Sequence, residues 1–321
     1  MNATTADAVT NSSVYGLAPQ AYIALLCCAG LSAIGSLVII VTYSLSKTLQ
    51  SKIILRQVFF LSIATLAQSL SYFLSLGQYG SDLQPLPYRQ FFCWAQGVVL
   101  QGCCLAGFVY NFYIAFDLVS FFDYVPQIKK HRLLYQLLVW PSVLMVSVIL
   151  YLSKSFDETG GYCWVKDDPV YIRIIVFYVP LYLILGFCCF AIIAIAYTLR
   201  KMQLYQENRR VVITAAAYNT VFLICWLPAS MFVASLASVV VFYFTLTMSL
   251  CRYRWFETRA DKDHDQSTND LPVGVQIMFA VCLTCQGLGN CLVWVSSRLY
   301  QVECRRLCSC KKAPVVHQYV L

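Results

Sequence analysis

The stretch AYIALLCCAGLSAIGSLVIIVTYSL, residues 21–45, contains no charged side chain. A membrane-spanning helix needs about 20 mostly apolar residues, because the hydrocarbon core of a bilayer is ~30 Å thick and an α-helix rises ~1.5 Å per residue. A helix also satisfies its own backbone hydrogen bonds in lipid, which an isolated strand does not. The stretch therefore predicts a helix that crosses a membrane.

Six further apolar runs follow. Of the 321 residues, 60% are hydrophobic and only 12% are charged, about half the charge of a typical soluble domain. We therefore expect an all-α membrane protein, in which a seven-transmembrane helical bundle (residues 21–296) lies between an N-terminal tail (1–20) and a C-terminal tail (297–321). The predicted spans are residues 21–45, 53–76, 91–118, 133–152, 172–199, 211–236 or longer, and 273–296.

The sixth run is unusually long. Residues 211–250 carry no charge, which is nearly twice the length of a span. We interpret the run as one long helix, with residues 239–250 projecting or folding back at the outer face. The loop that follows, residues 251–272, is rich in both signs of charge.

The basic residues predict the direction of the chain. With the N-terminus outside, the cytoplasmic segments carry 15 basic and 4 acidic residues, and the other side carries 8 basic and 11 acidic. Cytoplasmic loops favour Lys and Arg, so we expect an extracellular N-terminus, a cytoplasmic C-terminus and a multi-pass protein of the plasma membrane. Glycosylation sequons at Asn2 and Asn11 agree with this direction. The basic residues are scattered through short loops, so we expect no binding to nucleic acid.

Several cysteines are candidates for covalent modification. Cys93 and Cys163 both lie on the predicted outer side, where disulfide bonds persist. A bond between them would hold the second outer loop over the bundle; two unrelated thiols are the alternative. Cys304, Cys308 and Cys310 lie among basic residues after the last span, a setting for S-palmitoylation. We expect a short membrane-anchored helix there.

Polar and aromatic side chains in the outer halves of the spans are candidates for a ligand pocket. Such groups orient a small molecule within a mostly apolar cavity, although each of them could instead form hydrogen bonds between helices. The candidates are Gln96, Gln101, Trp164, Arg173, Tyr178, Tyr182, Trp226 and Gln276.

Basic residues at the inner face are candidates for binding a partner protein. They would surround a cleft that accepts an acidic partner surface, or they would only set the topology and contact anionic lipid. These residues are Lys129, Lys130, Arg132, Arg200, Lys201, Arg209 and Arg210.

Enzyme chemistry finds little support in the sequence. All three histidines lie in predicted loops or the tail, so we expect no metal site, no cofactor and no enzyme. Asp117 is the only ionised residue well inside a run. It could mark a solute pathway, or it could be a carboxylate at a helix end that pairs with Lys or Arg. A small-solute transporter and a non-signalling membrane protein therefore remain as alternatives.

Three prolines interrupt predicted spans: Pro141, Pro180 and Pro228. Proline removes a backbone donor and kinks a helix. Trp226 lies two residues before Pro228, so the inner end of the sixth span could swing outward at this point. A static kink is the alternative.

Four short motifs lie in the predicted spans and the second outer loop: Tyr162-Cys163-Trp164, Trp140-Pro141, Cys225-Trp226 and Gln286-Gly287-Leu288-Gly289-Asn290. Together they resemble the cyclic AMP receptor-like family of G-protein-coupled receptors, including its orphan relatives. The resemblance covers roughly residues 20–300 and implies a receptor for an extracellular small molecule that activates a heterotrimeric G protein. The Asp-Arg-Tyr and Asn-Pro-x-x-Tyr motifs of rhodopsin-like receptors are absent. The motif at residues 286–290 also resembles an element of secretin-like receptors.

Overall fold

A computed structural model describes most of the predicted helical region. The described residues are 19–50, 53–79, 86–120, 126–159, 162–166, 170–201, 212–227 and 273–308. Within them, four helices are long and apolar enough to cross a membrane, at Gln20–Leu45, Ile54–Ser75, Gln90–Val119 and Tyr171–Tyr197. Shorter apolar helical segments lie at Leu138–Leu152 and Val212–Leu227. The chain is a helical membrane protein, and the count of seven spans stays a prediction.

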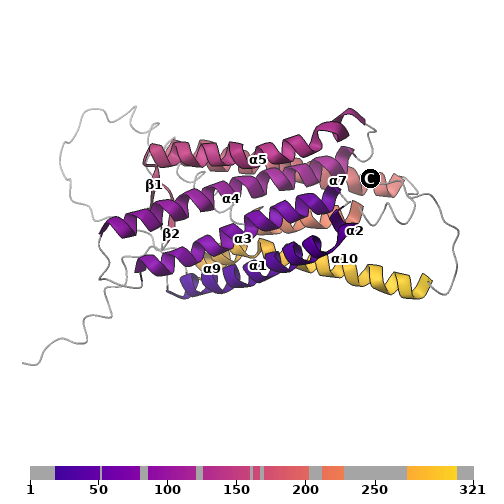
Figure 1. Ribbon diagram of the computed structural model, residues 1–321, viewed down its shortest axis with the longest axis horizontal. Helices are drawn as coiled ribbons and strands as arrows, with labels where there is room; N and C mark the ends of the chain where they lie inside the picture. The colour runs from indigo at the N-terminus through magenta and orange to yellow at the C-terminus, as the bar shows by residue number, and fades with distance from the viewer. Residues whose placement is uncertain are drawn as a thin grey trace, which may run out of the picture.

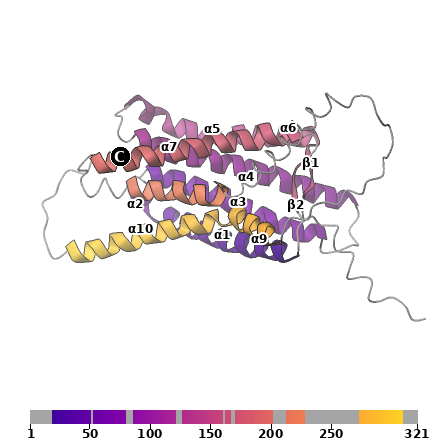
Figure 2. The ribbon, with the colours of Figure 1, turned by 180° about the vertical axis from the view of Figure 1, so that it is seen from behind.

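The long helices form one elongated bundle (Figures 1 and 2). Helix α4 is central, because it contacts α3, α5, α7 and both strands of a small hairpin, while α1 packs against α3, α9 and α10. The helices are α1 (Pro19–Leu45), α2 (Lys47–Gln50), α3 (Ile53–Tyr79), α4 (Leu86–Ser120), α5 (Pro126–Leu152), α6 (Val170–Arg173), η2 (Ile174–Tyr178), α7 (Val179–Lys201), α9 (Val273–Thr284) and α10 (Gln286–Cys308). The segment Val212–Leu227 is also helical.

Apolar side chains cover much of the outside of this bundle. Ile34, Leu183 and Ile193 are each more than 60% exposed, whereas the polar side chains of Ser36 and Thr65 are buried and share a hydrogen bond of 2.8 Å. A soluble protein buries its large aliphatic side chains. The reversed pattern is that of a bundle whose surface faces lipid.

A two-stranded hairpin lies at one end of the bundle, called here the hairpin end (Figure 1). Strand β1 (Phe156–Thr159) pairs antiparallel with β2 (Tyr162–Val165). The hairpin follows α5 through a helix cap, in which Lys154 takes a φ of 52° and the Ser155 amide donates to the Leu150 carbonyl at 2.9 Å. At Gly97 of α4 an added Cβ would lie 2.5 Å from the Phe156 ring, so glycine permits this close approach.

The fifth predicted span consists of three consecutive helical segments. Its π-helical turn, η2, is closed by the Val179 amide, which donates to the carbonyl of Ile174 five residues earlier. Pro180 follows directly and has no amide hydrogen to continue the α-helical pattern. Single π-helical turns are frequent at functional sites.

The seventh predicted span differs from its expected form. It breaks at Cys285 between α9 and α10, and α10 then continues to Cys308. We expected this span to end at residue 296 and a separate short helix to follow. No proline or glycine interrupts residues 290–308, so the helix continues.

Small residues bring α10 close to α1. An added Cβ at Gly287 would lie 2.5 Å from the Ser36 Oγ and 2.6 Å from the Ser32 carbonyl oxygen. The Gly287 amide, in the first turn of α10, donates to the Ser32 Oγ at 3.0 Å. Amides in the first turn of a helix have no partner within the helix, so Ser32 fills that role.

Candidate ligand site at the hairpin end

A disulfide bond joins α4 to the hairpin. It links Cys93, near the start of α4, to Cys163 in β2, with 5.1 Å between the Cα atoms. These are the two cysteines that the sequence places on the predicted outer side. The bond fixes β2 against the hairpin end of α4.

Gln96 adds a second attachment one turn further along α4. Its Oε1 accepts a hydrogen bond from the Cys163 amide at 2.9 Å, and its Nε2 donates to the Ser71 carbonyl of α3 at 2.8 Å. The side chain is fully buried. Gln96 therefore connects α3, α4 and β2 through one amide group.

Gln101 connects α4 to the hairpin and to η2. Its Oε1 accepts a hydrogen bond from the Trp164 indole Nε1 at 2.9 Å, and its Nε2 donates to the Val176 carbonyl at 3.4 Å. Gln101 is fully buried, and Trp164 is only 8% exposed. The hairpin thus inserts a large aromatic side chain into the bundle and bonds its polar atom there.

Arg173 covers a face of the Trp164 indole ring. Its guanidinium carbon lies 4.8 Å from the centre of the indole ring, a cation–π geometry. Its Nε donates to the Val165 carbonyl at 2.9 Å, and an Nη nitrogen donates to the same oxygen. Arg173 therefore holds both the backbone of β2 and the ring of Trp164.

Four aromatic side chains lead from the hairpin toward the sixth predicted span. We call Trp164, Phe177, Phe108 and Trp226 the aromatic column. Trp164 packs edge-on against Phe177 at 4.6 Å between ring centres, Phe177 lies 5.9 Å from Trp226, and Phe108 lies 4.9 Å from Trp226. Such pairs stabilise by about 0.5–1.5 kcal/mol beyond their buried area.

The column ends on α10. The Trp226 indole Nε1 donates a hydrogen bond to the Gln286 Oε1 at 2.8 Å, and both side chains are buried. Packing and hydrogen bonds therefore run without a break from β2 through η2 and the Val212–Leu227 helix to α10.

The structure brings five of the eight pocket candidates into this assembly: Gln96, Gln101, Trp164, Arg173 and Trp226. Tyr178 is half-buried and packs against Phe177 at 5.3 Å. Tyr182 is 41% exposed, so its side chain lies partly on the outside of the bundle. Gln276 belongs to α9, and its side chain lies outside the described part of the chain.

Sequence reasoning missed Phe108 and Phe177. Phe177 is 4% exposed and occupies the inward position that we expected for Tyr178. The π-helical turn explains the difference, because an extra residue per turn rotates the helix face. The only sequence signal is Pro180, which marks a span that cannot remain a regular α-helix.

The other predicted sites are described less fully. The first turns of α5 contain Lys129, Lys130 and Arg132, and the last turn of α7 contains Arg200 and Lys201. These two helix termini lie at the end of the bundle opposite the hairpin (Figure 1). Cys304 and Cys308 lie in the last turns of α10. For these seven residues only the backbone is described. Arg209, Arg210, Asn2, Asn11 and Cys310 lie outside the described residues.

Two polar side chains meet nearer that opposite end. Gln57 of α3 donates a hydrogen bond from Nε2 to the Asp117 Oδ2 of α4 at 2.7 Å, and both residues are buried. The carboxylate therefore takes part in packing between helices, which weakens the idea that it marks a solute pathway.

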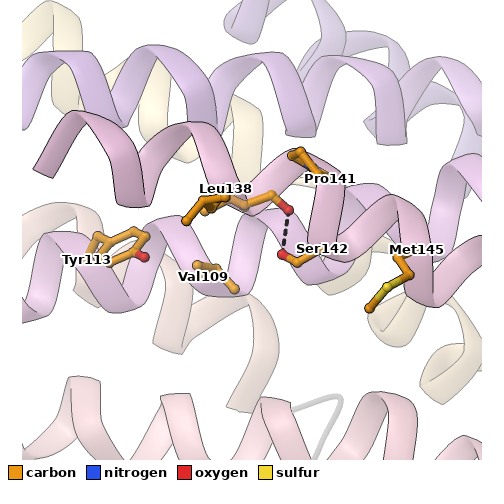
Figure 3. Close-up of a pocket in the computed structure, with 7 residues that line it drawn as sticks. Val109, Tyr113, Leu138, Pro141, Ser142 and Met145 are labelled. Carbon is orange, nitrogen blue, oxygen red and sulfur yellow. Dashed lines mark hydrogen bonds between the residues drawn. The ribbon is translucent and has the colours of Figure 1, made fainter. Parts of the chain in front are cut away.

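A shallow groove of about 470 Å³ lies between α4 and α5, and no residue of the aromatic column lines it (Figure 3). Leu138 and Met145 at its edge are 52% and 60% exposed. Within it the Ser142 Oγ donates to the Val139 carbonyl at 2.8 Å, as the dashed line in Figure 3 marks. The groove opens on the lipid-facing side of the bundle. Its lining residues are Val109, Tyr113, Leu138, Val139, Pro141, Ser142 and Met145.

Comparison with known proteins identifies the family. A protein described as G-protein coupled receptor 1 from Arabidopsis thaliana is 28% identical over 185 residues, which are 56% of this chain and 53% of that protein. The chain therefore spans about half the length of this relative. The family described as slime mold cyclic AMP receptor matches residues 17–254. Because this match covers most of the chain, from before α1 to beyond the Val212–Leu227 helix, the chain belongs to the slime mold cyclic AMP receptor family.

Proposed function

We propose that this chain is a plasma-membrane receptor that binds an extracellular small molecule at the hairpin end and activates a heterotrimeric G protein at the opposite end. Membership of a receptor family supports this reading. The printed name of the Arabidopsis relative points to the same class of protein.

The observation that carries the proposal is that Trp226 connects the aromatic column to α10. Its indole packs near Phe177 and donates a hydrogen bond to Gln286 of α10. A ligand that changes the packing around Trp164 would therefore change the contacts of the sixth and seventh predicted spans. Such a ligand shifts the equilibrium between two conformations only if it binds one of them more tightly.

The partner surface that we propose lies at the other end of the bundle. The first turns of α5 contain Lys129 and Lys130, and the last turn of α7 contains Arg200 and Lys201, so these residues lie at this end of the bundle. Basic groups there would guide the approach of an acidic partner surface. The G protein would enter between these helices when the inner end of the sixth span moves outward.

The first ligand to test is cyclic AMP, because the family is described as a cyclic AMP receptor family. The predicted outer loops and span ends contain Arg89, Lys154, Lys166 and Arg173, which would favour an anionic molecule, and acidic residues in the same loops, which would oppose it. Arg173 already bonds the Val165 carbonyl and covers Trp164, so an anion would compete with these contacts.

Guanine-nucleotide exchange tests the proposal. The full chain in lipid nanodiscs would be mixed with a panel of purified heterotrimeric G proteins, with and without cyclic AMP. We expect exchange above that of empty nanodiscs with at least one G protein. Trp226→Phe keeps a ring but loses the bond to Gln286, and should change that exchange, whereas Trp140→Phe on α5 serves as the matched control.

Two results would contradict the proposal. One is the absence of exchange with every G protein under every condition, for a chain that melts cooperatively. The other is accumulation of a labelled solute in proteoliposomes, which would favour a transporter.

A further inference from the structure

The hairpin is inserted into the bundle at the proposed ligand site. All four residues of β2, Tyr162–Val165, are buried. Trp164 lies between α4, which supplies Gln101, and η2, which supplies Phe177. The indole therefore forms the hairpin end of the aromatic column.

The contacts of Trp164 are those that a protein makes with a bound aromatic ligand. Its N–H has a buried acceptor in Gln101, its face is covered by the Arg173 guanidinium, and it packs edge-on against Phe177. Ligand pockets combine a mostly apolar lining with a few placed polar groups in this way. We propose that Trp164 is a built-in plug, which occupies the ligand space and holds the receptor in its resting conformation.

The plug is tethered closely. The disulfide bond fixes Cys163, the residue before Trp164, and Arg173 holds the carbonyl of Val165, the residue after it. Gln96 also bonds the Cys163 amide. Trp164 can therefore leave its position by a change of side-chain rotamer or a small shift of the hairpin, while the hairpin stays attached to α4.

The same contacts give the direction of the effect. With Trp164 in place, Phe177 stays packed near Trp226, and Trp226 stays bonded to Gln286. Packed interiors resist gradual deformation and change between discrete arrangements. Loss of the indole frees Phe177 to move, which lowers the cost of rearranging the sixth predicted span. Removal of the plug should therefore raise basal activity.

This inference rests on the proposed function, so its test needs a second readout. Three variants of the full chain in nanodiscs would be compared with the wild type: Trp164→Ala, Trp164→Phe and the control Trp94→Ala. Trp94 lies near the same end of α4 and packs edge-on against Tyr151 at 5.6 Å, outside the aromatic column. Basal nucleotide exchange and the melting temperature would be measured with and without added indole, which fits the space that Trp164→Ala leaves.

We expect Trp164→Ala to raise basal exchange about 5-fold or more, the lower end of measured couplings between sites. Indole should return this exchange toward the wild-type value and should have no effect on wild type or Trp94→Ala. Trp164→Phe, which keeps a ring but loses the N–H, should give a smaller rise. If Trp164→Ala does not fold, Trp164→Phe decides the question.

Where the wild type shows measurable exchange, a folded Trp164→Ala or Trp164→Phe whose exchange equals that of the wild type would overturn the plug. If no protein in the set shows exchange, the proposed function has failed, and the melting temperature then tests the plug alone. An indole-dependent rise in the melting temperature of Trp164→Ala, absent from Trp94→Ala, supports an indole-shaped space. If indole does not raise the melting temperature of Trp164→Ala, the plug is overturned.

Discussion

Gln101 donates a hydrogen bond from its Nε2 to the backbone carbonyl of Val176 at 3.4 Å. In a regular α-helix the amide of residue 180 would donate to this carbonyl, but residue 180 is proline. A side chain of α4 thus supplies the donor that the fifth predicted span lacks. The other end of the same amide group accepts from Trp164, so one side chain stabilises both η2 and the hairpin.

Gln101→Leu tests this double role. The change removes two hydrogen bonds and leaves the Trp164 N–H and the Val176 carbonyl without this partner. We expect a loss of about 1–3 kcal/mol, the cost of leaving buried polar groups unpaired, measured as a lower melting temperature in nanodiscs. Gln90→Leu changes an exposed glutamine of the same helix and should have little effect. Equal losses in the two variants would contradict the role.

Loss of the disulfide bond should weaken the fold. Cys93 and Cys163 are 70 residues apart in sequence, and bonds that close long loops stabilise proteins by about 2–4 kcal/mol. We expect Cys93→Ser, Cys163→Ser and the double variant to lose similar stability, because each removes the same bond. Thermal unfolding measures this. A double variant that loses twice as much as either single variant would show that the cysteines act separately.

Gly287→Val should separate α1 from α10. Even a Cβ would lie 2.6 Å from the Ser32 carbonyl oxygen, a backbone atom that cannot move aside alone. Overpacking of this kind costs about 1–3 kcal/mol, and we expect a lower yield of folded protein and a lower melting temperature. Gly186→Val in α7 is the control, since a Cβ there meets nothing within 4 Å. Comparable losses at both positions would contradict close packing at Gly287.

The Gln57–Asp117 bond predicts non-additive effects. Gln57→Leu removes a donor from a buried carboxylate, and hydrogen bonds to charged groups contribute about 1.5–3 kcal/mol. We expect Gln57→Leu and Asp117→Leu, which each remove the hydrogen bond, to destabilise the protein, and the double variant to lose less than their sum. Thermal melting of the four proteins gives the coupling energy. Strict additivity would mean that the two side chains do not interact in the membrane.

Apolar runs made part of the fold predictable. The helices that contain residues 21–45, 53–76, 91–118 and 172–199 follow from length and hydropathy, because lipid requires both. The burial of Gln96 and Gln101 also follows, since a polar side chain in a span avoids lipid. The exact helix ends do not follow: α5 begins at Pro126, seven residues before the predicted span, because a polar helical turn outside the lipid needs no apolar residues.

The hairpin, the π-helical turn and the break at Cys285 could not be predicted. Strand β2 is buried at every position, so it lacks the alternation that reveals a strand. The rotation that places Phe177 inside depends on η2, whose residues Ile174–Tyr178 read as ordinary apolar helix. The break before α10 coincides with the close contact at Gly287, which depends on a helix far away in sequence.

The π-helical turn also determines how this protein would respond to the deletion of a residue from the fifth predicted span. Each residue of an α-helix advances the face by about 100°, so η2 sets an angular offset between Arg173 of α6, which touches the hairpin, and α7. Deleting one residue from Ile174–Tyr178 would restore an ordinary helix and turn Arg173 away from Trp164 without breaking the span. Chain length at this turn thus governs how the hairpin is aligned with the core of the bundle, independently of side-chain chemistry.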